Sequence, residues 1–205
     1  SILMTKAIYN HDYFAELYRI NNGDPWQYEQ RWYEKRKRDM TLAVLPYPKF
    51  KNGIEIGCSN GVLSAELAER CEALLCMDAN STAIQLANQR LIHGHVKVVQ
   101  GIVPLDLPTQ QFDLIVASEM LYYLEENIML QLVEWMNTHL SPQGCIVACH
   151  WRHAIEGFSL NGEQVHQILK QRLHYYHHTQ LQDADFFLDV WTHDVNSIAV
   201  QEGLL

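Results

Sequence analysis

Residues 55–61, with the sequence Glu55-Ile56-Gly57-Cys58-Ser59-Asn60-Gly61, decide the fold that this chain is expected to adopt. The apolar run ending at Ile56 has the character of a short strand, and residues 62–70 have helical spacing. A strand that turns into a helix through glycines is typical of doubly wound sheets, which bind ligands at the carboxyl ends of their strands. Gly57 allows the tight turn, and Gly61 allows a ligand to approach the backbone. The alternative is a plain turn without a ligand.

The order of the remaining segments predicts a mostly parallel sheet. Strand character is found in residues 54–56, 73–77, 96–99, 112–117, 145–149, 175–181 and 186–193, and helical spacing in residues 62–70, 81–91, 127–140 and 162–173. Ser81 is a plausible N-cap for the second of these helices. Alternation of this kind gives βαβ units, and strands that are almost wholly apolar are covered on both faces. We therefore predict an α/β, Rossmann-like sheet of seven strands with helices on both faces and an antiparallel last strand.

The segment before the first strand is predicted to form a helical cap. Residues 5–46 have helical character with a break at residues 21–25, and the second helix, over residues 33–45, stops before Pro46. We expect one domain over residues 1–205, with the cap in residues 1–46 and the core in residues 47–205.

The composition indicates a globular, acidic protein. The 205 residues are 48 % hydrophobic and 19 % charged, and the formal net charge is −9. Proteins that bind a phosphate backbone usually carry a basic face, and the one basic run here is residues 31–38. Five cysteines without a C-x-x-C pair indicate a reducing compartment. No apolar stretch approaches about 20 residues. We expect a cytoplasmic protein with no nucleic acid or membrane partner, and the sequence does not indicate an oligomeric state.

The glycine spacing favours a particular cofactor. Dinucleotide sites usually show G-x-G-x-x-G, which cradles a pyrophosphate, whereas this chain lacks the middle glycine. S-adenosylmethionine (SAM) has no pyrophosphate and carries a sulfonium cation, which an acid such as Glu55 suits. Asp78 ends the second strand, where an acid about 20 residues after the glycine turn accepts hydrogen bonds from ribose hydroxyls. The alternative for Asp78 is a surface acid that caps the next helix.

Two later loops complete the predicted cofactor site. The loop after the third strand should pass beside the adenine, with backbone groups of Ile102 and Val103 available to the base. Ser118 and Glu119 follow the fourth strand and should lie at the mouth of the site.

These stretches together resemble the class I SAM-dependent methyltransferases. A narrower resemblance, over about residues 9–152, is to the NodS family, whose best-known members N-methylate a glucosamine of a chitooligosaccharide signal. It is carried by Asp24-Pro25-Trp26, Trp32-Tyr33-Glu34, Thr41-Leu42-Ala43-Val44-Leu45-Pro46, Ser118-Glu119, Tyr122-Tyr123-Leu124 and His150-Trp151-Arg152. One departure is Ile102, because many class I enzymes have an Asp in this loop for the adenine amino group.

The resemblance implies that SAM, and its product S-adenosylhomocysteine (SAH), are the cofactor pair. The helix after Trp32 would lean over the methionine end, with Arg36 holding the carboxylate by bidentate contact; a solvated charge run is the alternative. The predicted cofactor-binding residues are Tyr33, Arg36, Glu55, Gly57, Cys58, Ser59, Gly61, Asp78, Ala79, Ile102, Val103 and Ser118.

Methyl transfer to an amine needs an unprotonated nucleophile and exclusion of water. We predict that Glu119 and His150 form the acid/base pair that faces the acceptor. The acceptor pocket is predicted to include Tyr122, Tyr123, Trp151 and Arg152. A structural role for His150 and core packing for the tyrosines are the alternatives. No metal site is expected, because the histidines at 174, 177 and 178 have no companion at ligand spacing.

The sequence therefore predicts a SAM-dependent methyltransferase that acts on a small-molecule acceptor, such as an amine or sugar amine. Two alternatives remain open. A nicotinamide-dependent oxidoreductase would need the glycine that is missing from the turn, and a catalytically silent SAM-binding regulator would not need the polar residues Glu119, His150 and Arg152.

Overall fold

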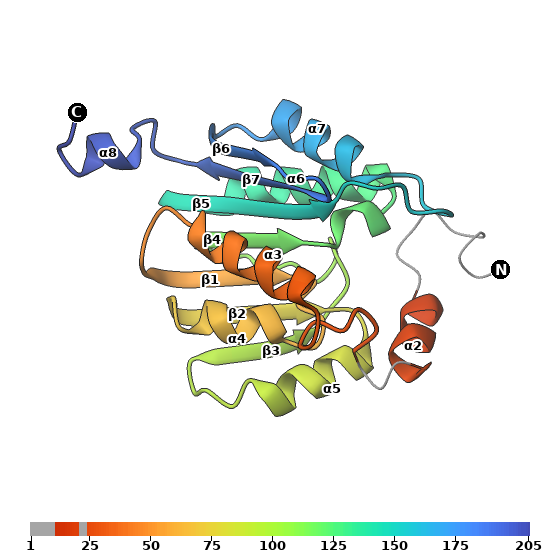
Figure 1. The fold of residues 1–205 in the computed structure, drawn as a ribbon. Helices are drawn as coiled ribbons and strands as arrows, with labels where there is room; N and C mark the ends of the chain where they lie inside the picture. The colour runs from red at the N-terminus through yellow and green to blue at the C-terminus, as the bar shows by residue number, and fades with distance from the viewer. Residues whose placement is uncertain (1–10, 21–23) are drawn as a thin grey trace.

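The computed structural model describes residues 11–20 and 24–205, in which seven strands form one sheet with the order β3-β2-β1-β4-β5-β7-β6 (Figure 1). The strands are β1 (Phe50–Ile56), β2 (Cys71–Asp78), β3 (Val96–Gln100), β4 (Phe112–Ser118), β5 (Leu140–Trp151), β6 (Tyr176–Gln182) and β7 (Phe186–Thr192). Strands β3, β2, β1, β4 and β5 pair in parallel, whereas β7 is antiparallel to both β5 and β6. The predicted mostly parallel sheet is therefore confirmed.

Helices cover both faces of this sheet, as Figure 1 shows. The helices are α2 (His11–Ile20), α3 (Trp32–Ala43), α4 (Val62–Ala68), α5 (Ser81–Arg90), α6 (Glu126–His139), α7 (Gly162–Arg172) and α8 (Ile198–Gln201), with a 3-10 turn η1 (Leu121–Tyr123). Helices α3, α4 and α5 lie on one face and α6 and α7 on the other, while α2 lies beyond the carboxyl ends of the strands.

The central strand β4 shows why helices pack on both faces of the sheet. Leu114, Ile115, Val116 and Ala117 have no exposed surface. Because successive side chains of a strand point to opposite faces, Leu114 and Val116 pack into the core under α4 and α5, and Ile115 and Ala117 into the core under α6 and α7. Burial on both faces explains the continuous apolar run in the sequence.

Several boundaries differ from the sequence predictions. The N-cap of α5 is Asn80 rather than Ser81, since the Asn80 side chain accepts a hydrogen bond of 2.8 Å from the backbone of Ala83. Strand β5 begins at Leu140, five residues before the predicted strand of residues 145–149, and its register with β4 shifts between Leu140 and Cys145. The predicted first helix is described from His11 onward, and residues 5–10 and 21–23 of that prediction lie outside the described residues. Helix α8 was not predicted.

The topology creates a crevice at the carboxyl ends of the central strands. Strand β1 lies between β2 and β4, and the helices that follow β1 and β4 cover opposite faces. Ligands of doubly wound sheets bind at this switch point. In the described part of the chain, every helix is too short or too polar to cross a membrane.

Candidate active site

A cavity of about 550 Å³ lies at the carboxyl ends of the central strands. One wall comes from the ends of β1, β2 and β4, and another from aromatic side chains of the cap. A second, smaller cavity of about 40 Å³ lies against α3. Gly57, Ser59, Ser118 and Glu119 line both cavities, so the two spaces meet at the turn after β1 and at the end of β4.

The turn after β1 has the backbone geometry that only glycine adopts readily at two positions. Gly57 and Gly61 have φ angles of 80° and 87°, and Ser59 between them has φ 54°. A Cβ on Gly57 would lie 2.8 Å from Cβ of Met120, which packs beneath the turn. Gly61 lines neither cavity; a Cβ there would meet Leu91 at 3.2 Å, so this glycine permits close packing on the helix behind it.

Asp78 connects the end of β2 to this turn. Its Oδ2 accepts a hydrogen bond of 2.8 Å from the backbone of Ser59, and its Oδ1 accepts one of 2.9 Å from the backbone of Asn80. The alternative, a surface acid capping the next helix, does not hold, because Asn80 is the cap of α5. Asp78 and Ala79 line the large cavity, where a ribose would meet the carboxylate.

The loop after β3 brings Ile102 and Val103 to the same cavity. However, the backbone N–H of Ile102 donates to Oδ2 of Asp106 at 2.8 Å, and the carbonyl of Ile102 accepts from the Asp106 backbone at 2.8 Å. The prediction that backbone groups of Ile102 bind the adenine is therefore corrected for its N–H, because this group already has a partner. Val103 remains the residue that is predicted to bind the edge of the adenine through its backbone.

Glu119 stands where the two cavities meet, with its backbone in the left-handed region at φ 56°. One carboxylate oxygen accepts from the backbone of Trp151 at 2.7 Å, and the other from the hydroxyl of Tyr122 at 2.8 Å. A non-glycine residue in this region carries a strain of about 1–3 kcal/mol and persists where its surroundings hold it. These two hydrogen bonds fix the Glu119 side chain and so stabilise this backbone conformation.

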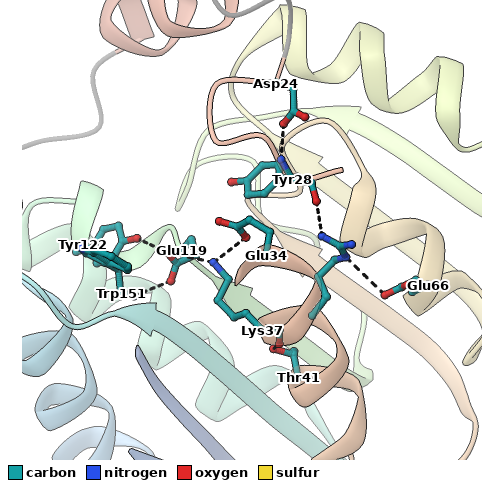
Figure 2. A network of polar contacts seen from close by, with 10 residues as sticks. Asp24, Tyr28, Glu34, Lys37, Thr41, Glu66, Glu119, Tyr122 and Trp151 are labelled. Atoms are coloured by element: carbon teal, nitrogen blue, oxygen red, sulfur yellow. Dashed lines mark hydrogen bonds and ion pairs between the residues drawn. The ribbon is translucent and has the colours of Figure 1, made fainter. Parts of the chain in front are cut away.

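Lys37 brings a buried cation from the cap to this carboxylate (Figure 2). Its Nζ lies 3.0 Å from Oε2 of Glu34 and 3.7 Å from Oε2 of Glu119, and its side chain is 6 % exposed. Burial alone would lower the pKa of Lys37, but the carboxylates of Glu119 and Glu34 raise it above its ordinary value. Burial also raises the pKa of Glu34, against the effect of Lys37. Lys37 is therefore held as a cation beside Glu119.

Arg38 joins the cap to the smaller cavity. Its Nη1 donates to the backbone carbonyl of Tyr28 at 2.6 Å, and its Nε lies 3.8 Å from Oε2 of Glu66. Tyr28 is held in turn by its backbone N–H, which donates to Asp24 at 2.8 Å (Figure 2). These contacts place the segment after Asp24 against α3.

The structure corrects the prediction for Arg36. Its guanidinium pairs with Asp183 at 2.7 Å and lies over the ring of Phe186, and it lines neither cavity. Neighbouring residues of a helix point about 100° apart, so Lys37 and Arg38 face the smaller cavity where Arg36 does not. Lys37 and Arg38, together with Glu34, were missed as individual site residues, although they belong to the basic run.

Most of the predicted acceptor residues stand behind the cavity wall. Tyr123 lines the large cavity, but Tyr122, Trp151 and Arg152 do not. The ring of Trp151 packs edge-on against Tyr33 at 5.7 Å, and Arg152 donates to the carbonyl of Asp183 at 2.8 Å. Tyr33 itself, predicted to bind the cofactor, lines neither cavity and packs also on Phe186.

His150 does not face the cavity either. It is fully buried, and its Nε2 accepts from the backbone N–H of Leu121 at 3.2 Å, while its Nδ1 lies 2.9 Å from Nε2 of His166. Burial holds the pKa of His150 well below its usual range. The prediction that His150 faces the acceptor is corrected: the side chain packs on the α7 side of the sheet, behind η1.

Glu55 and Cys58 line the smaller cavity. Glu55 accepts a hydrogen bond from the hydroxyl of Ser64, and burial raises the pKa of Glu55 to about 8. Burial also raises the pKa of the Cys58 thiol well above its ordinary value, so this thiol is not a nucleophile.

The aromatic wall of the large cavity was the largest omission from the sequence analysis. Phe14 and Tyr18 come from α2, and Trp26 and Tyr28 from the segment that precedes α3. The rings of Trp26 and Tyr28 stack at 5.6 Å. The available signal is the stretch Asp24-Pro25-Trp26, whose tryptophan lines the cavity although no site role was predicted for it.

The sequence profile of the family described as Nodulation protein S (NodS) matches residues 10–183 of this chain. The chain belongs to the NodS family. Curated members include Nodulation protein S of Sinorhizobium fredii, 31 % identical over 146 residues that cover 65 % of this chain and 68 % of that protein. Nodulation protein S of Rhizobium tropici is also 31 % identical, over 67 % of this chain and 59 % of that protein.

Solved structures agree with this membership. N-methyltransferase NodS from Bradyrhizobium japonicum WM9, in complex with SAH, superposes with a TM-score of 0.78 at 29 % identity, over 89 % of this chain and 98 % of that one. A putative methyltransferase from Pseudomonas syringae is 45 % identical, with a TM-score of 0.71 over 79 % of this chain and 99 % of that one. This NodS family member has the class I fold and is a SAM-dependent methyltransferase. The oxidoreductase alternative is thereby set aside.

Proposed function

We propose that this SAM-dependent methyltransferase transfers a methyl group to the nitrogen of an amine on a small, ring-containing acceptor such as a sugar amine, with Glu119 taking the proton of that amine. The observation that carries the proposal is the position of Glu119, a carboxylate shared by the two cavities and held by Trp151 and Tyr122. A carboxylate at this point attracts an ammonium and accepts its proton.

The residues present fit SAM. Asp78 and Ala79 would meet the ribose, and Val103 the adenine, in the large cavity. Gly57 lines the large cavity, and the absence of a side chain there lets the turn pack closely on Met120. The methionine end would point into the smaller cavity, where the cations of α3 match a carboxylate, and the acidic side chains of α3 and β1 offer oxygen acceptors to an ammonium.

Bound SAM supplies an electrophilic methyl carbon: the amine nitrogen forms the new C–N bond while the C–S bond breaks, and sulfur keeps the electron pair to give SAH. The chain contributes positioning and exclusion of water. Aromatic rings from the cap form the remaining wall of the cavity, and aromatic faces favour both cationic methyl groups and sugar rings. An amine acceptor agrees with the name of the Bradyrhizobium japonicum relative, an N-methyltransferase.

The test is methyl transfer from radiolabelled SAM to a panel of amino sugars, chitooligosaccharides with a free amine, and alkyl amines, with the product identified by mass spectrometry. Glu119→Gln should lower kcat by roughly 100-fold or more. Glu125→Gln is the matched control, because Glu125 lines the same cavity away from the junction. Tight SAH binding without methylation of any amine, or methylation on oxygen alone, would overturn the proposal; the first result would favour a silent SAM-binding protein.

A further inference from the structure

A buried chain of hydrogen bonds runs behind the active site, from the 3-10 turn to the far edge of the sheet. Nδ1 of His150 lies 2.9 Å from Nε2 of His166, and Nδ1 of His166 lies 2.5 Å from Oδ2 of Asp189. The other oxygen of Asp189 lies 2.7 Å from Nε2 of His177. His150, His166 and Asp189 are at most 1 % exposed, and His177 at the end is partly exposed.

The ring protons of His150 and His166 have one arrangement that satisfies all of these hydrogen bonds. The backbone N–H of Leu121 donates to Nε2 of His150, so that nitrogen carries a lone pair and the ring proton is on Nδ1. Nδ1–H of His150 then donates to Nε2 of His166, which places the proton of His166 on Nδ1, where it donates to Asp189. The Asp189 carboxylate accepts hydrogen bonds from both His166 and His177.

The electrostatics agree with this assignment. Burial lowers the pKa of both His150 and His166, so both rings are neutral. Burial alone would raise the pKa of Asp189, but the hydrogen bonds from His166 and His177 lower it, so its carboxyl is ionised. A neutral imidazole has one donor and one acceptor, and each is used here by a defined partner.

This series of hydrogen bonds ends at the 3-10 turn η1, which carries a hydrogen-bond partner of Glu119. Leu121 is the first residue of η1, and Tyr122, the second, donates its hydroxyl to Glu119. The rings of Tyr122 and His150 also pack edge-on at 5.2 Å. Elements that are remote in sequence therefore converge on η1: His150 comes from β5, His166 from α7 and Asp189 from β7.

We propose that His150, His166 and Asp189 form a buried positioning relay, which holds η1 so that Tyr122 presents its hydroxyl to Glu119 during methyl transfer. His150 acts in this relay as a hydrogen-bond acceptor for Leu121 and as a donor to His166, and it takes no proton from the acceptor. The inference rests on the proposed function, because it assigns the relay to the support of Glu119.

Substitutions separate a positioning role from a base. Glutamine keeps one acceptor and one donor group on its side-chain amide but cannot take a proton at neutral pH, whereas leucine offers neither. His150→Leu and His166→Leu should lower kcat by roughly 10- to 100-fold, since small displacements of catalytic groups have effects of this size. The KM for SAM should change less than about threefold, because neither residue lines a cavity. His150→Gln and His166→Gln should keep most of kcat.

His139→Leu is the control, since His139 lies on α6, stacked on Trp135 and outside the relay. Equal losses in His150→Gln and His150→Leu would overturn the proposal, because they would mean that the imidazole moves a proton. Wild-type kcat in folded His150→Leu or His166→Leu would also overturn it.

A measurement on the unmodified protein needs no acceptor and no substitution. Nitrogen NMR of the histidine rings should show His150 and His166 protonated on Nδ1 and unprotonated on Nε2, unchanged between pH 6 and pH 8. A proton on Nε2 of either ring would contradict the relay. If wild-type protein binds SAH but methylates no amine, the proposed function fails, while this spectrum still decides whether the relay exists.

Discussion

Nζ of Lys37 lies 3.7 Å from Oε2 of Glu119, across the junction between the helical cap and the carboxyl end of β4. The same ammonium contacts Glu34, one turn earlier on α3, at 3.0 Å. One buried cation thus offsets two carboxylates, and it couples the position of the cap to the residue proposed to meet the acceptor.

Removal of Lys37 should destabilise the fold strongly. Lys37→Met leaves Glu34 and Glu119 without their cation, and breaking a buried ion pair from one side costs about 3–5 kcal/mol. Urea denaturation followed by circular dichroism measures the change. Lys35→Met is the matched control: Lys35 pairs with Asp39 on the exposed side of the same helix, where a pair contributes about 0–1 kcal/mol. Equal losses in the two variants would contradict the role of the buried cation.

Glu55 predicts a pH dependence of stability. In the folded chain burial raises its pKa to about 8 from an ordinary value of 4.5, so between these pH values the native state binds more protons than the unfolded state. Stability from this group is present at low pH and declines as pH rises to about 8, by up to about 1.4 kcal/mol per pH unit.

Glu55→Gln, which keeps an acceptor for Ser64, removes this decline. Its free energy of unfolding relative to wild type should rise from pH 5 to pH 8 in the absence of SAM. Glu69→Gln, on the exposed end of α4, controls for the loss of one negative charge. A difference between Glu55→Gln and wild type that stays constant over this range would show that Glu55 is ionised throughout.

Gly57→Ala should disrupt both the fold and the cofactor site. The backbone there has φ 80°, and the added Cβ would lie 2.8 Å from Cβ of Met120. We expect a loss of stability of more than about 1 kcal/mol, with weaker SAH binding. Gly94→Ala is the control, because a Cβ at Gly94 meets nothing within 4 Å. If Gly57→Ala behaves like Gly94→Ala in thermal unfolding and in SAH titration, the turn is not as constrained as the structure indicates.

The local parts of the site could be predicted from the sequence. Gly57 directly follows one apolar strand and Asp78 ends the neighbouring one, and the carboxyl ends of parallel strands lie at the same end of the sheet. The geometry that such a pattern needs is contained within a few residues of chain.

The parts that depend on tertiary packing were mispredicted. Arg36 and Lys37 are equivalent in composition, and the packed face of α3 decides that Lys37 turns inward. His150 and Trp151 are adjacent in β5 and point to opposite faces of the sheet. His150 joins the relay on the α7 side, whereas Trp151 contacts Tyr33 on the α3 side. Trp26 and Tyr28 lie in a connection without periodicity, where no pattern indicates which side chains line a cavity.

Calorimetric titration of SAM and SAH into wild type and Asp78→Ala tests whether the large cavity binds the cofactor. We expect micromolar binding to wild type, and a loss of at least about tenfold in the variant, because charged hydrogen bonds contribute about 1.5–3 kcal/mol each. Far-ultraviolet circular dichroism of the variant shows whether the fold survives loss of the contacts to Ser59 and Asn80. Absence of binding to wild type, or unchanged binding to a folded Asp78→Ala, would contradict the assignment of the large cavity to the cofactor.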